Sequence, residues 1–170
     1  MTSLDIIKSF NHCFTASYNV VLKAGADEPV YLPAQGYHPA EIHFREDFLS
    51  SALHEISHWC LAGSARRTQE DYGYWYESDS RNLQQQHMFE SVEVKPQAIE
   101  KMLHHVLGLS FRVSADNLAI QDYDTSAFEN AVYHQFACYI TQTFPERAEQ
   151  FAQQLLSEQN INVSLYEFLK

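Results

Sequence analysis

The chain has 170 residues, a usual length for one domain, and we expect residues 1–170 to form a single domain. A composition of 45% hydrophobic and 19% charged residues, with only 5 Gly and 5 Pro, excludes collagen-like, low-complexity and broadly disordered proteins. The 11 Lys and Arg against 22 Asp and Glu give a formal net charge of −11, which disfavours nucleic acid as a direct partner and is compatible with a cationic substrate.

The first part of the chain predicts two helices that flank a pair of short strands. Apolar residues recur at helical spacing over residues 3–22 and again from about 47 to 62, where Gly63 is a typical stop. Residues 30–32 and 42–44 are short apolar runs that predict two strands separated by a proline-containing loop.

The middle of the chain predicts a third strand and a long helical region. The aromatic run at residues 72–76 is typical of a strand. A helix is predicted from Arg81, with Ser80 as its N-cap, as far as Gly108. Because proline has no backbone N–H, we expect Pro96 to kink this helix or divide it in two.

The last third of the chain predicts one short strand at residues 111–113 and two helices. Ser126 and Glu129 form a capping-box pattern for a helix that reaches about Phe144, and Pro145 can open the next helix. The predicted fold is therefore α+β, with helices packed around a small, mostly antiparallel or mixed sheet.

One local motif carries a specific chemical signal. Residues 54–58 read His-Glu-Ile-Ser-His, an HExxH on the predicted central helix. Residues four apart lie one turn apart on the same helix face, so His54 and His58 can reach one metal ion while Glu55 projects beside them as a candidate catalytic residue. The alternative is an ordinary helix with two partly exposed histidines.

A third metal ligand has to come from elsewhere, and two downstream carboxylates compete for that position. Glu90 and Glu93 lie three residues apart on the helix predicted after Arg81. We favour Glu93, because the residues that follow it place an amide, Gln97, four positions on; the other carboxylate would then orient an imidazole, and the two roles are interchangeable at this stage.

Other polar and aromatic residues are candidates for a substrate pocket. We expect Arg66, Arg67, Tyr74 and Gln97 to border the approach to the metal, and ordinary core and surface packing is the competing interpretation. The neighbouring His104 and His105 point to different helix faces, so the sequence predicts no second metal site there.

Taken alone, the HExxH motif favours a zinc peptidase in which Glu55 is the general base. The motif lacks the later Gly and third His of metzincins, which excludes that class. A third hypothesis is a non-catalytic module of the translation machinery whose metal only stabilises the fold.

The motif belongs to a larger set of segments, which comprises residues 54–60, 62–63, 66–67, 72–76, 89–98, 27–29 and 31–34. Together they resemble the bacterial elongation factor P hydroxylase family over most of the chain, with a resemblance that fades toward the C-terminus. Only the HExxH within this set is generic.

The resemblance implies a metal-dependent hydroxylase that acts on elongation factor P after its conserved lysine has received a β-lysyl group. It implies Fe(II), with zinc as the alternative, held by His54, His58 and either Glu93 or Glu90. Glu55 would move a proton or attract the ammonium groups of the modified lysine. The implied fold is similar to that of a metal-dependent bacterial ribonuclease, and the electron donor is left open.

The cysteines and the N-terminus add expectations about location. Cys13, Cys60 and Cys138 are widely spaced and form no CxxC, which predicts neither a disulfide framework nor a cysteine-based zinc site. No signal peptide and no apolar run near the ~20 residues of a membrane span are apparent, so we expect a cytoplasmic protein without a membrane partner.

Overall fold

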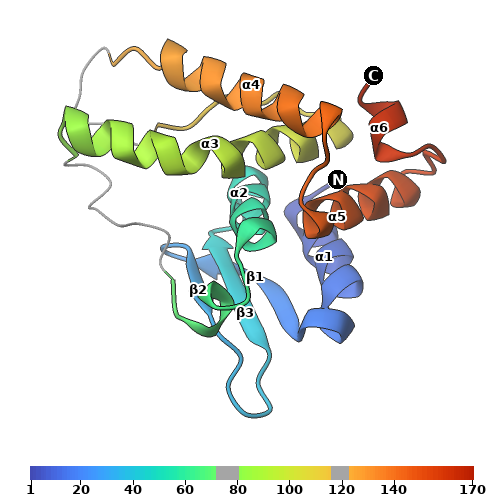
Figure 1. Ribbon diagram of the computed structural model, residues 1–170. Helices are drawn as coiled ribbons and strands as arrows, with labels where there is room; N and C mark the ends of the chain where they lie inside the picture. Colours follow the sequence, from blue (N-terminus) through green and yellow to red (C-terminus); the bar gives the residue numbers. More distant parts are fainter. Residues whose placement is uncertain (72–80, 116–122) are drawn as a thin grey trace.

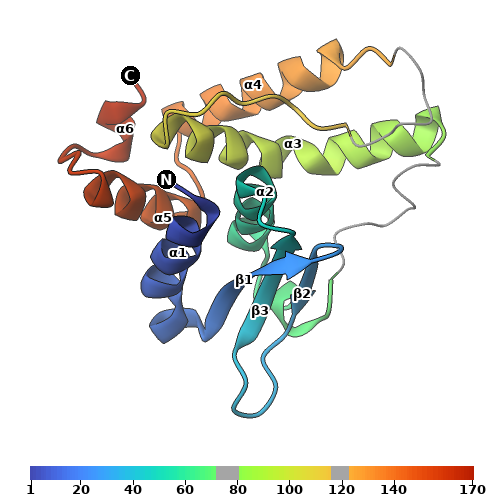
Figure 2. The same cartoon turned by 180° about the vertical axis from the view of Figure 1, so that it is seen from behind.

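The computed structural model describes residues 1–71, 81–115 and 123–170 (Figures 1 and 2). Its elements in chain order are α1 (Ser3–Tyr18), β1 (Val20–Ala26), β2 (Val30–Leu32), β3 (Ala40–Arg45), α2 (Leu49–Leu61), the 3-10 turn η1 (Arg66–Thr68), α3 (Leu83–Val106), α4 (Ser126–Thr141), α5 (Glu146–Glu158) and α6 (Leu165–Phe168). This arrangement confirms the predicted α+β class with helices around a small mixed sheet.

The sheet has the order β1-β3-β2, with β3 parallel to β1 and antiparallel to β2. The prediction that the first helix extends to residue 22 is wrong, because α1 ends at Tyr18 and β1 follows at once. Asn19 adopts the left-handed conformation with φ of 50°, which asparagine tolerates better than most residues, and so terminates the helix. Val20 then pairs with Ala40 of β3.

The hydrophobic core lies between the sheet and three helices. α1 packs against β1 and α2 against β3, while α5 contacts both helices from the side away from the sheet (Figure 1). Aromatic rings join these elements: the Phe14 ring centroid lies 4.8 Å from that of Trp59 and 6.0 Å from that of Phe151. The core thereby fixes one face of α2 and leaves its other face for α3.

α3 is one continuous helix that crosses over α2 and carries α4 along its length (Figures 1 and 2). Its N-cap is Asn82, which forms a capping box with Gln85, so the prediction of Ser80 as N-cap is wrong. Pro96 lies inside the helix without dividing it, and the helix packs against both α2 and α4.

Three predictions in the C-terminal half need correction or fall outside the described residues. Residues 111–113 form no strand; they follow α3 as an extended segment whose neighbour Ser114 bonds to Gln97. α4 ends at Thr141 rather than near Phe144, and its start has no capping box because the Ser126 N–H bonds to Asp124 instead. The strand predicted at residues 72–76 lies outside the described residues.

Two expectations from composition can be compared with the structure. Among the described residues, no helix is both long and apolar enough to span a bilayer. Cys13, Cys60 and Cys138 are all free thiols, and Cys60 is buried.

Candidate metal centre

The two histidines of the HExxH motif lie side by side on the face of α2 that meets α3. Leu53 and Ile56, which have no solvent exposure, turn toward the core and so direct His54 and His58 the other way. The Nε2 atoms of the two imidazoles are 3.1 Å apart, and their ring centroids are separated by 4.6 Å. The helix spacing thus brings two imidazole nitrogens to one point.

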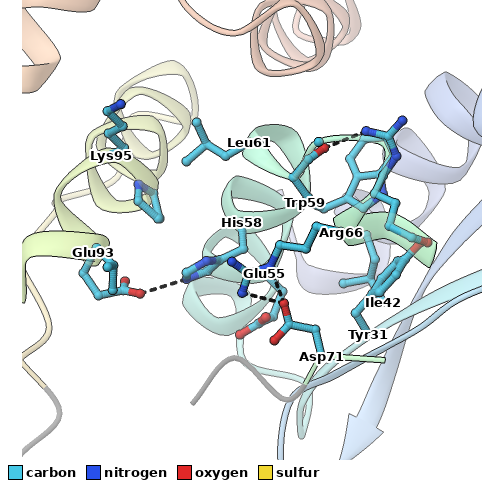
Figure 3. A pocket seen from close by; sticks show the side chains of 15 residues that line it. Tyr31, Ile42, Glu55, His58, Trp59, Leu61, Arg66, Asp71, Glu93 and Lys95 are labelled. Atoms are coloured by element: carbon cyan, nitrogen blue, oxygen red, sulfur yellow. Dashed lines mark hydrogen bonds and ion pairs between the residues drawn. The ribbon is translucent and has the colours of Figure 1, made fainter. Parts of the chain in front are cut away.

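Glu93 of α3 completes this point from across the helix interface. Its Oε1 lies 3.2 Å from His58 Nε2 and its Oε2 lies 3.7 Å from His54 Nε2. The three residues form a group whose ligand atoms all lie within 4.8 Å of one another. Figure 3 shows the Glu93 carboxylate directed at His58.

These separations fit a bound metal ion. Metal–ligand bonds of about 2.1 Å place neighbouring ligands about 3.0 Å apart at right angles and about 3.4 Å apart at tetrahedral angles. The observed distances of 3.1 and 3.2 Å lie within this range, and the distance of 3.7 Å exceeds it by about 0.3 Å. Two imidazoles and one carboxylate are also the ligand set of open sites in zinc hydrolases and non-haem iron enzymes.

Electrostatics favour a cation between these groups. Burial alone would raise the pKa of Glu93, but the charges of His58 and His54 outweigh it and hold that pKa well below its usual range. Burial opposes protonation of His54, yet Glu100, Glu93 and Glu55 raise its pKa well above the usual value. The carboxylates thus create a site of negative potential in which a metal ion can replace imidazole protons.

Glu90, the competing carboxylate of the sequence analysis, is placed elsewhere. Its side chain is buried, and its Oε1 accepts a hydrogen bond from Gln86 Nε2 at 3.1 Å, one turn earlier on α3. It is absent from the group formed by His54, His58 and Glu93. The crossing of α3 over α2 therefore presents Glu93, and not Glu90, to the two imidazoles.

A cavity of about 400 Å³ opens beside the cluster, within the range usual for small-ligand sites (Figure 3). His58, Glu93 and Glu55 line one side of it. On the other side stands Arg66, whose Nε and Nη2 both lie 2.6 Å from Asp71 Oδ2. The apolar part of the lining comes from both helices and the sheet: Ile42, Trp59, Leu61, Val92 and Pro96.

The residues predicted to border a substrate pocket are placed differently from one another. Arg66 and Arg67 line the cavity. Gln97 is buried behind Glu93, where its Nε2 lies 3.4 Å from Glu93 Oε2 and 2.8 Å from the Ser114 carbonyl oxygen, so it holds the carboxylate rather than lining the cavity. Tyr74 lies outside the described residues.

Glu55 combines access to the cavity with a perturbed carboxyl group. Burial raises its pKa, the nearby imidazoles of His54 and His58 oppose this shift, and the charges of Glu93 and Glu100 add to it. A carboxyl group with a raised pKa beside a metal site is suited to taking or giving a proton.

The sequence analysis missed one residue of the cluster, Glu100. Its Oε2 lies 2.9 Å from His54 Nδ1, and its Oε1 lies 3.5 Å from His104 Nε2. Burial opposes ionisation of Glu100, but its contacts with the imidazoles of His104 and His54 outweigh burial and lower its pKa. Its position seven residues after Glu93, and therefore two turns further on the same face of α3, was the available signal.

No second metal group occurs among the residues that the structure describes. His104 bonds through Nδ1 to the Ser110 carbonyl oxygen at 2.8 Å, in the manner of a structural histidine.

The C-terminal end of α2, just beyond His58, is held by an arginine from α5. Arg147 Nη2 lies 2.8, 3.0 and 2.6 Å from the carbonyl oxygens of Trp59, Cys60 and Ala62. Its guanidinium carbon also lies 4.6 Å from the Trp59 ring centroid. The Trp59 carbonyl oxygen also accepts from the Ala62 N–H and the Ala62 carbonyl oxygen from Arg67 Nη1, so Arg147 adds donors to the C-terminal end of the motif helix and helps to keep its last turn in place.

Comparison with known proteins finds a matching family and a similar relative for this chain. A family model described as elongation factor P hydroxylase matches residues 9–166, which include both helices of the cluster. A protein of Haemophilus influenzae named elongation factor P lysine hydroxylase is 46% identical over 168 residues, or 96% of this chain and 94% of the relative. Neither description supports the peptidase hypothesis.

Proposed function

The chain belongs to the elongation factor P hydroxylase family, and on that basis we propose that residues 1–170 form one domain that hydroxylates elongation factor P. The target would be the lysine that carries a β-lysyl group, and the enzyme would act in the cytoplasm with its protein substrate. The observation that supports the site is the convergence of His54, His58 and Glu93 beside a cavity.

The metal in this proposal is Fe(II), held by His54 Nε2, His58 Nε2 and the Glu93 carboxylate. Bound Fe(II) would supply the redox chemistry needed to activate dioxygen with positions left open on a facial triad, which redox-inactive zinc does not provide. Insertion of one oxygen atom into a C–H bond sends the other atom to water and consumes two electrons and two protons. An external two-electron donor must therefore take part.

The cavity suits a long side chain with a cationic end. Ile42, Leu61 and Pro96 offer apolar contacts for methylene groups, while Glu55 offers a carboxylate for an ammonium group. The same carboxyl group can hold a proton close to the reacting atoms. We therefore assign Glu55 the catalytic role and His54, His58 and Glu93 the role of metal ligands.

The test is the intact mass of β-lysylated elongation factor P after aerobic incubation with the protein, ascorbate and either Fe(II) or Zn(II). We expect a gain of one oxygen atom with Fe(II) only, and its loss in the His58→Ala variant. His43→Ala is the matched control, because His43 pairs with Glu41 in the sheet and does not line the cavity.

Two results would overturn the proposal. An equal mass gain in the His58→Ala variant would remove the assigned site from the reaction. Cleavage of a peptide substrate by the Zn(II) form, without any mass gain in the Fe(II) form, would replace the hydroxylase by the zinc peptidase.

A further inference from the structure

Glu100 occupies a bridging position behind the metal cluster. The carboxylate lies between two imidazoles, with Oε2 at 2.9 Å from His54 Nδ1 and Oε1 at 3.5 Å from His104 Nε2. The side chain is 10% exposed, and it does not line the cavity. It therefore contacts a metal ligand without being placed to touch a substrate.

The contacts of Glu100 determine which nitrogen of His54 carries the hydrogen. A carboxylate accepts hydrogen bonds but donates none, so His54 Nδ1 must donate at this position. In a neutral imidazole the other nitrogen, Nε2, then keeps its lone pair. Nε2 is the atom that lies 3.1 Å from His58 Nε2 and 3.7 Å from Glu93 Oε2.

A second imidazole, that of His104, lies on the far side of Glu100. The Ser110 carbonyl oxygen can only accept, so His104 Nδ1 donates to it at 2.8 Å, and this bond turns His104 Nε2 toward Glu100. Glu100 and His104 are four residues apart on α3 and thus lie on one helix face. His104 Nε2 has no hydrogen-bond partner among the described residues, so its approach to Glu100 at 3.5 Å is an electrostatic contact, whereas the contact with His54 Nδ1 at 2.9 Å is a hydrogen bond.

We propose that Glu100 is a positioning residue that orients His54 and selects the tautomer whose Nε2 binds the metal. This inference rests on the metal centre of the proposed function and adds a residue behind the three ligands. Carboxylates that bond to the second nitrogen of a metal-binding histidine typically change metal affinity by about 10–100-fold when removed.

The test measures binding of Co(II) by its visible absorption, together with proton NMR of the Zn(II) form labelled with ¹⁵N at histidine. Glu100→Ala removes the acceptor, Glu100→Asp keeps the charge but withdraws it by one methylene, and Glu100→Gln keeps an acceptor oxygen in place. Glu41→Gln is the control, since Glu41 also pairs with an imidazole, 2.7 Å from His43 Nε2 in the sheet.

We expect Glu100→Ala and Glu100→Asp to bind Co(II) about 10–100-fold more weakly than the wild type, and Glu100→Gln to lose less than either. The slowly exchanging Nδ1 proton of His54 should be visible in the wild type and in Glu100→Gln and absent in Glu100→Ala. The control should match the wild type in both measurements.

Wild-type affinity and an unchanged Nδ1 proton in Glu100→Ala and Glu100→Asp would overturn the inference while leaving the metal centre intact. A wild-type protein that binds no Co(II) would instead overturn the metal centre on which the inference rests. Circular dichroism shows whether Glu100→Ala folds. If it does not, the Co(II) affinities of Glu100→Asp and Glu100→Gln are compared: weaker binding by Glu100→Asp supports the inference, and equal affinities overturn it.

Discussion

Replacing Arg147 by Met tests how the end of the motif helix is held. The Arg147 guanidinium donates through Nη2 to the carbonyl oxygens of Trp59, Cys60 and Ala62 at 2.6–3.0 Å. Methionine keeps most of the length and the apolar contact with the Trp59 ring but donates no hydrogen bond. The variant therefore leaves the final carbonyls of α2 with fewer partners at the turn that follows His58.

The expected loss in the free energy of unfolding can be worked out from these contacts. Nη2 carries two hydrogens for three acceptors, so two full hydrogen bonds from a charged donor contribute about 3–6 kcal/mol before costs. Burial lowers the pKa of Arg147, and the charge of Arg67 adds to that shift. Arg147 Nε also has no hydrogen-bond partner among the described residues. These costs reduce the net contribution of the Arg147 hydrogen bonds to the free energy of unfolding. We expect a net loss of about 3 kcal/mol.

Thermal unfolding followed by circular dichroism measures this loss. For a chain of this size, about 3 kcal/mol corresponds to a fall in Tm of about 6–12 °C. Arg45→Met is the control, because Arg45 is exposed at the end of β3 and its substitution should stay within about 0.5 kcal/mol. A fall in Tm for Arg147→Met no larger than that of the control would refute the anchoring of α2 by Arg147.

The remaining predictions concern the metal centre and the thiols. Glu93→Gln should weaken Co(II) binding by more than about 100-fold, which exceeds the usual effect of removing a residue that only contacts a metal ligand. Glu90→Gln should leave Co(II) binding nearly unchanged. Equal losses of affinity in a Co(II) titration of the two variants would contradict the placement of Glu93. Removal of metal with EDTA should abolish hydroxylation while the far-ultraviolet circular dichroism spectrum stays helical, because the hydrophobic core does not include His54, His58 or Glu93. Unfolding on removal of the metal would instead favour a metal that only stabilises the fold. Burial raises the pKa of Cys60 to about 12, so iodoacetamide at about pH 8 should label the half-buried Cys138 first, and peptide mass mapping that finds early labelling of Cys60 would count against its burial.

The local half of the site could be predicted from the sequence. The HExxH spacing places His54 and His58 one turn apart on any helix, and the apolar residues Leu53, Ile56 and Trp59 predict that the helix packs with its histidines turned away from the core. A cap signal at Ser80 and the stop at Gly108 predicted the helical region that carries Glu93, with a kink or division expected at Pro96. These features depend on interactions between residues at most four positions apart, so a single sequence contains the information needed to predict them.

Contacts between distant segments decided the rest. Glu90 and Glu93 both lie buried on α3, and only the crossing of α3 over α2 brings the second of them to the imidazoles. Glu100 reaches His54 through the same crossing, across 46 positions of sequence. Likewise, the helical spacing of apolar residues continues past Asn19, but pairing of β1 with β3 makes that stretch a strand. Tertiary packing overrides the local pattern at such points because the stabilising partners lie far along the chain.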